Sequence, residues 1–223
     1  MNKQEFIIEA KERIKGKILN DNLIIFFVRV IEDLKNNDDP NLFGRLKDLY
    51  VLINPYSHYH EHEIYKFLKS DFKCNDGMKL DDAEKSYIKI FMGELRRDFH
   101  LKNPKVMKGR INGILNKLCD KYFPLSSRKL EPFLLGKLIG AVGGIERLKN
   151  MPSSTIQLIG AEIAMFRHLS RNERGPKYGL LYYSRYIQGE KNKGRAARKL
   201  ANKLAITIKV DYFRNLDNNR LYK

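Results

Sequence analysis

Apolar residues recur at intervals of three and four along most of this chain of 223 residues, and this helical rhythm limits its fold more than any other feature. Stretches that alternate apolar and polar residues are few, and none is joined to another by an Asn-Gly turn of the kind that closes a β-hairpin. The sequence therefore predicts an all-α protein.

The rhythm breaks at Pro, Gly and acidic clusters, and these breaks divide the chain into expected helices. The expected ranges are 3–15, 21–36, 40–53, 60–69, 80–99, 104–122, 127–149, 152–170 and 192–214. The two long stretches around Asn103-Pro104 suggest an antiparallel helix pair. Pairs of this kind often form homodimers, although these heptads are too irregular to predict a coiled coil from the pattern alone.

The positive charge of the chain is concentrated in its second part. Of the formal net charge of +17, residues 1–125 carry +4 and residues 126–223 carry +13. An excess of this size indicates a polyanionic partner, most often a nucleic acid. We therefore expect a helical, coiled-coil-like supporting region over 1–125 and an anion-binding domain over 126–223.

The segment 156–170, placed on a continuous helix, divides into two arcs. The apolar arc contains Ile156, Leu158, Ile159, Ile163, Met165, Phe166 and Leu169. The opposite arc contains Gln157, Gly160, Ala161, Ala164, Arg167 and His168. Its small residues would allow a ligand to approach the backbone closely, or they would mark where another helix of the same protein crosses. Glu162 falls in the apolar arc, where a buried carboxylate would need a basic partner or backbone amides to cap.

The expected last helix has one apolar and one basic face. Ala197, Leu200, Ala201, Leu204 and Ile208 form the expected core face. The other face carries Arg195, Arg198, Lys199, Asn202, Lys203 and Lys209. Asp211 is the only acidic residue between Lys191 and Phe213, so this face either contacts phosphates or is a solvated basic surface.

The segment between these two helices is rich in Gly, Arg and Tyr. Lys177, Tyr178, Tyr182, Tyr183 and Arg185 are candidates to stack on or contact an exposed base. Several tyrosines could instead anchor the loop to the core. We expect Lys177 to point outward and the pair Leu180-Leu181 to point inward.

Three ordered stretches carry a family resemblance: "LIGAVGGIERLKNMPSSTIQLIGAEIAMFRHL", "GPKYGLLYYS" and "NKGRAARKLANKLAITIKVDYF". Over about residues 133–213 they resemble the Nop domain of box C/D ribonucleoprotein core proteins, which a spliceosomal RNA-processing factor shares. The upstream stretch from Asp21 to Pro55 is similar to the start of that family's helical dimerisation region. Ile163 stands where the family's Gly-Ala-Glu-Lys motif has lysine, while Arg167 matches the family's arginine.

The resemblance implies a non-catalytic scaffold that recognises a kink-turn RNA already bound by a small kink-turn-binding protein. It implies a role in box C/D assembly for guided 2′-O-methylation of rRNA; the alternatives are a stand-alone RNA-processing adaptor and a protein–protein interaction module. Because only about 20 residues precede the helical region, we do not expect fibrillarin to dock. The candidate RNA-binding residues are Gln157, Gly160, Ala161, Arg167, His168, Lys177, Arg185, Lys193, Arg195, Arg198 and Lys199.

Other chemistry finds little support in the sequence. P-loop, dinucleotide-binding and nucleophile motifs are absent, so we expect neither an enzyme nor a cofactor. The stretch "HYHEH" at residues 58–62 offers imidazoles that could bind a metal, but its spacing does not favour a site and we expect no metal. Cys74 and Cys119 form no paired motif, and no apolar run reaches the length of a membrane span. These features predict a cytoplasmic protein with no membrane contact.

Overall fold

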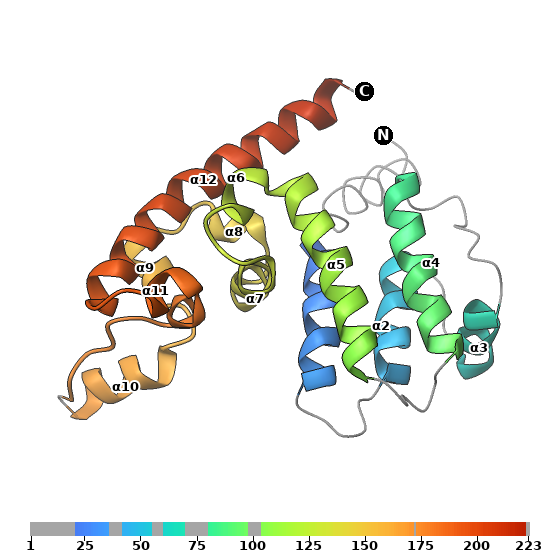
Figure 1. Ribbon diagram of the computed structural model, residues 1–223, viewed down its shortest axis with the longest axis horizontal. Coiled ribbons are helices and arrows are strands. Elements are labelled where there is room, and N and C mark those ends of the chain that lie inside the picture. The colour runs from blue at the N-terminus through green and yellow to red at the C-terminus, as the bar shows by residue number, and fades with distance from the viewer. Residues whose placement is uncertain are drawn as a thin grey trace, which may run out of the picture. The chain divides into compact units, whose positions relative to one another are not determined.

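A computed structural model describes residues 21–35, 42–54, 60–69, 80–97, 104–171 and 173–221, and every regular element in these ranges is a helix (Figure 1). The prediction of an all-α protein is therefore confirmed. The helix expected near 3–15 lies outside the described residues. The chain divides into two compact units, Met1–Ile114 and Leu115–Lys223. This division falls within α5 (Pro104–Tyr122). The assignment of 1–125 to a supporting region and of 126–223 to a binding domain stays a prediction.

Unit 1 is built on an aromatic cluster between helices. The described helices of this unit are the one over residues 21–35, α2 (Leu42–Ile53), α3 (Glu61–Lys69), α4 (Asp82–Arg97) and the first part of α5. The rings of Phe26, Phe27 and Phe91 meet edge to face, with centroids 5.2 to 6.0 Å apart, and all three are buried. This edge-to-face geometry stabilises aromatic pairs beyond the area they bury.

The start of α4 shows why the sequence located this helix well. The Asp81 carboxylate accepts a hydrogen bond from the Glu84 amide at 2.8 Å, and the Glu84 carboxylate accepts one from the Asp81 amide at 3.1 Å. This reciprocal capping satisfies amides that have no partner within the helix. Farther along, Arg110 of α5 pairs with Glu94 of α4, which joins the two helices of the expected pair.

Unit 2 is organised around one long helix. Its elements are α6 (Pro124–Ser127), α7 (Pro132–Val142), α8 (Ile145–Leu148), α9 (Ser153–Leu158), α10 (Glu162–Arg171), the 3-10 helix η1 (Leu180–Tyr183), α11 (Arg185–Gln188) and α12 (Lys193–Leu221). Of these, α6, α8, α9, η1 and α11 all contact α12. No described helix, including the long α12, is apolar over enough of its length to traverse a lipid bilayer.

A buried carboxylate fixes α12 against the start of α6. Asp211 is fully buried and accepts hydrogen bonds from the Leu125 amide at 3.2 Å, the Ser126 amide at 2.9 Å and the Ser126 hydroxyl at 2.7 Å. A buried charge is costly unless its acceptor positions are used, and here one carboxylate receives three donors. Asp211 is therefore structural and is not available to a ligand.

The helix expected over 127–149 is divided into two, α7 and α8, and α6 ends at the first residue of that range. A turn at 128–131 precedes Pro132, which starts α7, and Gly143 ends α7 in the left-handed region at φ 81°. Gly144 follows at φ 126°, before α8 begins. Since residues with a side chain rarely adopt these angles, the Gly143-Gly144 pair ends the helix. The prediction of a single helix here is wrong because the apolar pattern continues through the breaks.

Candidate nucleic-acid interface

A sharp turn at Gly160 separates α9 from α10. Gly160 has φ 85°, and a Cβ added there would lie 2.6 Å from Cγ of Leu180. Both the backbone angle and the lack of space therefore require glycine. The predicted continuous helix over 152–170 is wrong, and so is the division of that helix into two faces.

Hydrogen bonds tie this turn to the segment that precedes η1. The Leu180 amide donates to the Ile159 carbonyl at 2.7 Å, and the Gly179 amide donates to the Gln157 carbonyl at 2.9 Å. The Gln157 side-chain amide donates to the Lys177 carbonyl at 2.6 Å. We call these three bonds the clasp. The small residue at Gly160 therefore allows close contact within the chain, and not contact with a ligand. The neighbour is η1, whereas the sequence suggested a crossing helix.

Glu162 belongs to the same turn. Its Oε1 accepts a hydrogen bond from the Gly160 amide at 2.7 Å, so the expectation that it caps backbone is confirmed. The expectation that Glu162 is buried is wrong, because the side chain is exposed. Because an exposed carboxylate keeps most of its contact with water, Glu162 needs no basic partner, and the hydrogen bond from the Gly160 amide is enough.

None of the ten residues of α10 is buried. Ile163, Phe166 and Leu169 are 71%, 73% and 75% exposed, and we call them the apolar edge of α10. The prediction that these three residues face the core is wrong. Of the seven residues in the expected apolar arc, only Ile156 and Ile159 are buried, and both come before the turn. The turn at Gly160 directs α10 away from the rest of unit 2 (Figure 1), so its apolar residues have no core to face.

A groove runs between α9 and α10. Its volume is about 400 Å³, and Leu158, Ile159, Met165, Phe166 and Leu169 line most of it. Exposed apolar surface of this kind usually marks a place where another molecule binds. The groove therefore extends the apolar edge of α10 toward the body of unit 2.

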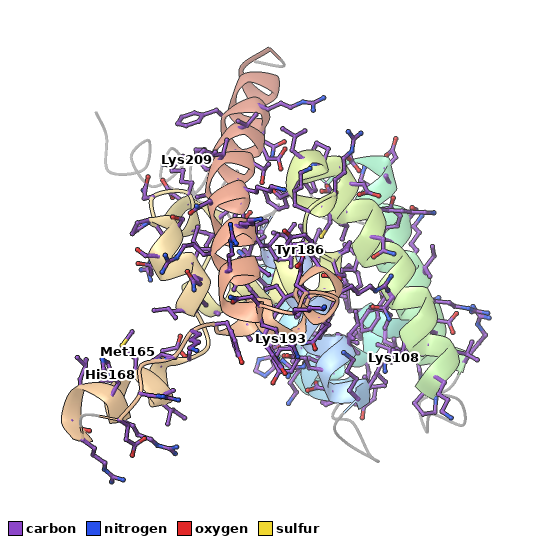
Figure 2. The ribbon with its side chains drawn as sticks, turned by 60° about the vertical axis from the view of Figure 1, so that its left-hand side comes forward. Lys108, Met165, His168, Tyr186, Lys193 and Lys209 are labelled. Carbon is purple, nitrogen blue, oxygen red and sulfur yellow. The ribbon has the colours of Figure 1, made fainter. Side chains whose placement is uncertain are left out.

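A basic edge lies beside the apolar one on α10. Arg167 and Arg171 are four residues apart and therefore share one side of the helix, and both are exposed. In the part of the chain that the structure describes, the side chain of Arg167 makes no hydrogen bond or ion pair. His168, one residue farther, is half-buried, and its Nδ1 contacts the Glu173 carbonyl. Figure 2 shows Met165 and His168 on α10, apart from the residues labelled on α11 and α12.

A second group of cations gathers at the start of α12. Lys177 is exposed, and a Cβ added to Gly194 would lie 3.5 Å from Cδ of Lys177, so the stem of this lysine crosses the first turn of α12. This confirms that Lys177 points outward. Leu181 is buried and Leu180 is half-buried, which confirms that the leucine pair points inward. The clasp holds the Lys177 backbone in this position.

Tyrosines lie next to these cations. Tyr178 and Tyr182 stack with ring centroids 4.7 Å apart, and Lys193 Nζ lies 5.0 Å above the ring of Tyr182. Lys193 Nζ also lies 3.3 Å from Oε1 of Gln188, so this lysine has partners within the chain. Tyr183 is 69% exposed, and its ring meets that of Tyr182 edge to face at 5.7 Å. Tyr178 and Tyr182 therefore serve contacts within the chain, whereas base contact by Tyr183 stays a prediction.

The basic face of α12 continues from this point. Arg195, Arg198 and Lys199 are exposed. The expected core face of the helix is confirmed, because all five of its residues are buried: Ala197, Leu200, Ala201, Leu204 and Ile208. Arg185 lies on α11 with a side chain that is 94% exposed and 4.0 Å from the Glu131 carboxylate.

The candidate residues therefore fall into two classes. Gln157, Gly160 and His168 serve contacts within the chain, Ala161 lines the groove, and Lys193 has internal partners. The exposed cations are Arg167, Lys177, Arg185, Arg195, Arg198 and Lys199. The exposed Arg171 and Arg174 extend this set and were not selected from the sequence, although the charge run around them was the available signal.

The histidine stretch at residues 58–62 is described only in part. The rings of His60 and His62 stack with centroids 5.8 Å apart, whereas His58 lies outside the described residues. Among the described residues there is no group of three or more His, Cys, Asp or Glu placed to hold a metal ion.

Relatives cover most of this chain. A NOP5 family protein of Methanocaldococcus jannaschii is 33% identical over 218 residues, which is 86% of this chain and 52% of that protein. Nucleolar protein 56 of Schizosaccharomyces pombe is 31% identical over 232 residues, which is 87% of this chain and 45% of the relative. Nucleolar protein 58 of the same yeast is 42% identical over 91 residues, 38% of this chain and 18% of that protein. The chain spans about half the length of the first two relatives.

These names contradict the predicted cytoplasmic location. The relatives from Caenorhabditis elegans, Schizosaccharomyces pombe and Saccharomyces cerevisiae are nucleolar proteins. That prediction rested on cysteine usage, which is typical of any reducing compartment, and the nucleus is as reducing as the cytoplasm. The sequence features used for the prediction therefore could not separate the two.

The family itself follows from the length of the match. The family model described as "Nop: snoRNA binding domain, fibrillarin" matches residues 17–221, nearly the whole chain. Its description agrees with an exposed cationic surface on a helical framework, and the matched range contains all three stretches that carried the resemblance. The chain belongs to the Nop family.

Proposed function

We propose that this protein is a non-catalytic RNA-binding scaffold which joins a kink-turn RNA after a small primary protein has bound that RNA. The setting would be box C/D ribonucleoprotein assembly for guided 2′-O-methylation of rRNA. The family description as a snoRNA-binding domain supports RNA as the partner. The observation that carries the proposal is α10, a helix that exposes an apolar edge and an arginine together.

The two edges of α10 suit two chemical classes of partner at once. Ile163, Phe166 and Leu169 gain free energy when they leave water, at about 25 cal/mol per Å² of apolar area, and an RNA backbone offers little apolar area to bury them. Arg167, which presents several N–H donors, suits a phosphate. A composite edge made of a protein and the RNA it holds satisfies both sides of the helix.

The cations at the start of α12 form the second part of the proposed surface. Lys177, Arg195, Arg198 and Lys199 are exposed and have no acidic neighbour on the helix between Lys191 and Ala201. Such a surface binds phosphates without reading sequence, and its affinity falls steeply as salt rises. Specificity for the bound kink-turn complex would then come from α10.

Unit 1 has a supporting role in this proposal. Dimerisation through residues 20–125 stays a prediction, as does the assignment of 1–125 to a helical region and 126–223 to the RNA-binding Nop domain. We assign no part of the described surface of unit 2 to fibrillarin. The family description concerns binding and names no reaction of the Nop domain itself, which supports a scaffold without catalysis.

A three-way binding experiment tests the proposal. The full chain is titrated in gel-shift assays against a kink-turn RNA alone, its primary binding protein alone, and the preformed complex of the two. We expect tight binding to the complex only. Equal affinity for bare RNA and for the complex would contradict recognition of a composite surface and would favour a general RNA-binding role.

Single variants then separate the two edges of α10. Arg167→Ala should weaken binding to the preformed complex by about 1–3 kcal/mol, the usual scale for a hydrogen bond to a charged group. Phe166→Ser should weaken binding to the complex and leave the weak affinity for bare RNA unchanged. Arg128→Ala removes an exposed arginine outside the proposed surface and serves as the matched control for lost charge. Unchanged assembly in Arg167→Ala would refute the role of that residue.

A further inference from the structure

The exposed face of α12 changes its chemistry halfway along the helix. Its first half presents Arg195, Arg198 and Lys199. Its second half presents Ile206, Val210 and Phe213, which are 66%, 47% and 55% exposed. These three residues have the spacing i, i+4, i+7 and therefore lie on one side of the helix. We call them the α12 stripe.

The stripe is not an extension of the core. The core side of the same turns is formed by Leu204, Ile208 and Asp211, all fully buried. Ile206, Val210 and Phe213 lie on the opposite side of the helix from these residues. Single exposed apolar residues are normal on a protein surface, but three in register over two turns indicate a binding surface.

Positive charges surround the stripe. Lys203, Lys209 and Arg214 are exposed on the same helix. Lys149, which directly follows α8, places its Nζ 3.7 Å above the ring of Tyr212 and 5.5 Å from the ring centroid of Phe213. Figure 2 shows Lys209 well along α12 from Lys193.

Between Lys191 and Phe213, where the side chains of α12 are described, no acidic side chain is exposed. Asp211 is the only acid between Lys191 and Phe213, and its buried carboxylate is occupied by Leu125 and Ser126. A partner of the opposite sign would therefore meet charges of one sign on both sides of an apolar centre.

We propose that the α12 stripe is a docking site for a short acidic amphipathic helix of a partner protein. A helix laid along α12 would match the apolar spacing of the stripe with its own residues at i, i+3 or i+4, and i+7. Carboxylates on either side of that apolar seam would face the surrounding lysines. The stripe from Ile206 to Phe213 spans about 10 Å, which two to three helical turns of the partner would cover.

Charge argues against the other occupants. A second copy of this chain, docked through the same stripe, would bring two lysine-rich surfaces together, and like charges in an interface are unfavourable. RNA would satisfy the lysines but leave Ile206 and Val210 against a polar backbone. An acidic helix is the occupant that complements both the apolar centre and its charged border.

This inference stands apart from the proposed function, because the stripe shares no residue with α10 or with the cations at the start of α12. The two can therefore be tested with opposite variants. Ile206→Ser/Val210→Ser alters the stripe alone, and Arg195→Ser/Arg198→Ser alters the basic half of the same helix alone. All four side chains are exposed, so both variants should unfold at the same urea concentration as the parent chain.

The test is a selection from a display library of random helical peptides of about 15 residues, carried out on the full chain. We expect enriched peptides that combine an apolar seam with flanking Asp and Glu. Their affinity should fall about tenfold or more for Ile206→Ser/Val210→Ser, since two apolar contacts are lost. It should fall only slightly for Arg195→Ser/Arg198→Ser, which should instead lose affinity for the RNA complex.

Four results would overturn the proposal. One is enrichment of basic or uncharged peptides, and another is enrichment that is indifferent to the stripe variant. The third is a loss of affinity for the RNA complex in Ile206→Ser/Val210→Ser equal to that in Arg195→Ser/Arg198→Ser, which would make RNA the occupant. Analytical ultracentrifugation of the parent chain and the stripe variant completes the test, because a dimer lost only in the variant would make a second copy the occupant.

Discussion

Replacement of Gly179 by alanine is expected to weaken unit 2 strongly. A Cβ built at this position would lie 2.0 Å from the carbonyl oxygen of Ile159, 2.7 Å from its carbonyl carbon and 2.8 Å from that of Leu158. All three are backbone atoms, so no side-chain rotation can relieve the overlap. Ordinary van der Waals contact begins at 3.4 Å, and the two chain segments must therefore separate by more than 1 Å.

That separation breaks the clasp. The bonds from Gly179 to Gln157 and from Leu180 to Ile159 are 2.9 and 2.7 Å long, and neither survives a displacement of this size. Each contributes about 1 kcal/mol net, and the overpacking adds about 1–3 kcal/mol. We expect Gly179→Ala to lower the free energy of unfolding of unit 2 by about 3–5 kcal/mol, a large share of the 5–15 kcal/mol typical of a whole domain.

Urea denaturation followed by circular dichroism measures this loss. Gly189→Ala is the matched control, because Gly189 lies in the same unit at φ −76° and a Cβ there would meet nothing closer than 3.6 Å. We expect this control to stay within about 0.5 kcal/mol of the parent chain. A loss below about 1 kcal/mol in Gly179→Ala, or one equal to that of the control, would show that the segment can shift without cost.

Two further predictions concern buried groups of unit 2. Asp211→Asn should lower the free energy of unfolding by about 1–3 kcal/mol, because the new side-chain NH2 group would face donors from Leu125 and Ser126, and a urea midpoint equal to that of the parent chain would refute this. Burial raises the pKa of the Cys119 thiol from 9.0 to about 12, so peptide mapping after iodoacetamide treatment at pH 8 should show Cys119 modified slowly in the folded chain and quickly in urea. Fast labelling of the folded chain would contradict the burial of Cys119. Because the pKa of this thiol is higher in the folded chain than in the unfolded one, the thiol should not affect the free energy of unfolding below pH 9. That free energy should decline as the pH rises from 9 toward 12.

The helices that the sequence located well are those with a local signal at their ends. Asp81 and Glu84 cap α4 with their own side chains, and Pro104 stands at the first position of α5. Signals of this kind act over three or four residues and do not depend on the rest of the fold. The core face of α12 was equally predictable, because one helix keeps a single register along its whole length.

The turn at Gly160 had no such signal. Apolar residues continue at helical spacing from Ile156 to Leu169, so periodicity alone favours an unbroken helix. What bends the chain is a contact with Leu180, twenty residues away in the sequence, and the hydrogen bond from Leu180 to Ile159. The reason for glycine at position 160 therefore lies in a tertiary contact that the sequence does not display.

The apolar edge of α10 shows a second limit. Ile163, Phe166 and Leu169 repeat as core residues do, and hydrophobic periodicity reports only that a face avoids water. It cannot distinguish a face buried within the chain from one that a partner covers. Only the direction of α10, set by the turn at Gly160, separates the two cases.

The basic start of α12 and the α12 stripe lie on one helix. The buried face of α12 runs without interruption from Ala196 to Asp211, and Asp211 fixes its far part to α6. Since that face is constant, the change from Arg195 to Ile206 on the exposed face cannot reflect a change in packing. Under the two proposals made here, it corresponds to two environments outside the unit, one polyanionic and one with apolar surface. Variants at either end should consequently act independently, because distant exposed sites on a well-packed element contribute additively to binding and stability.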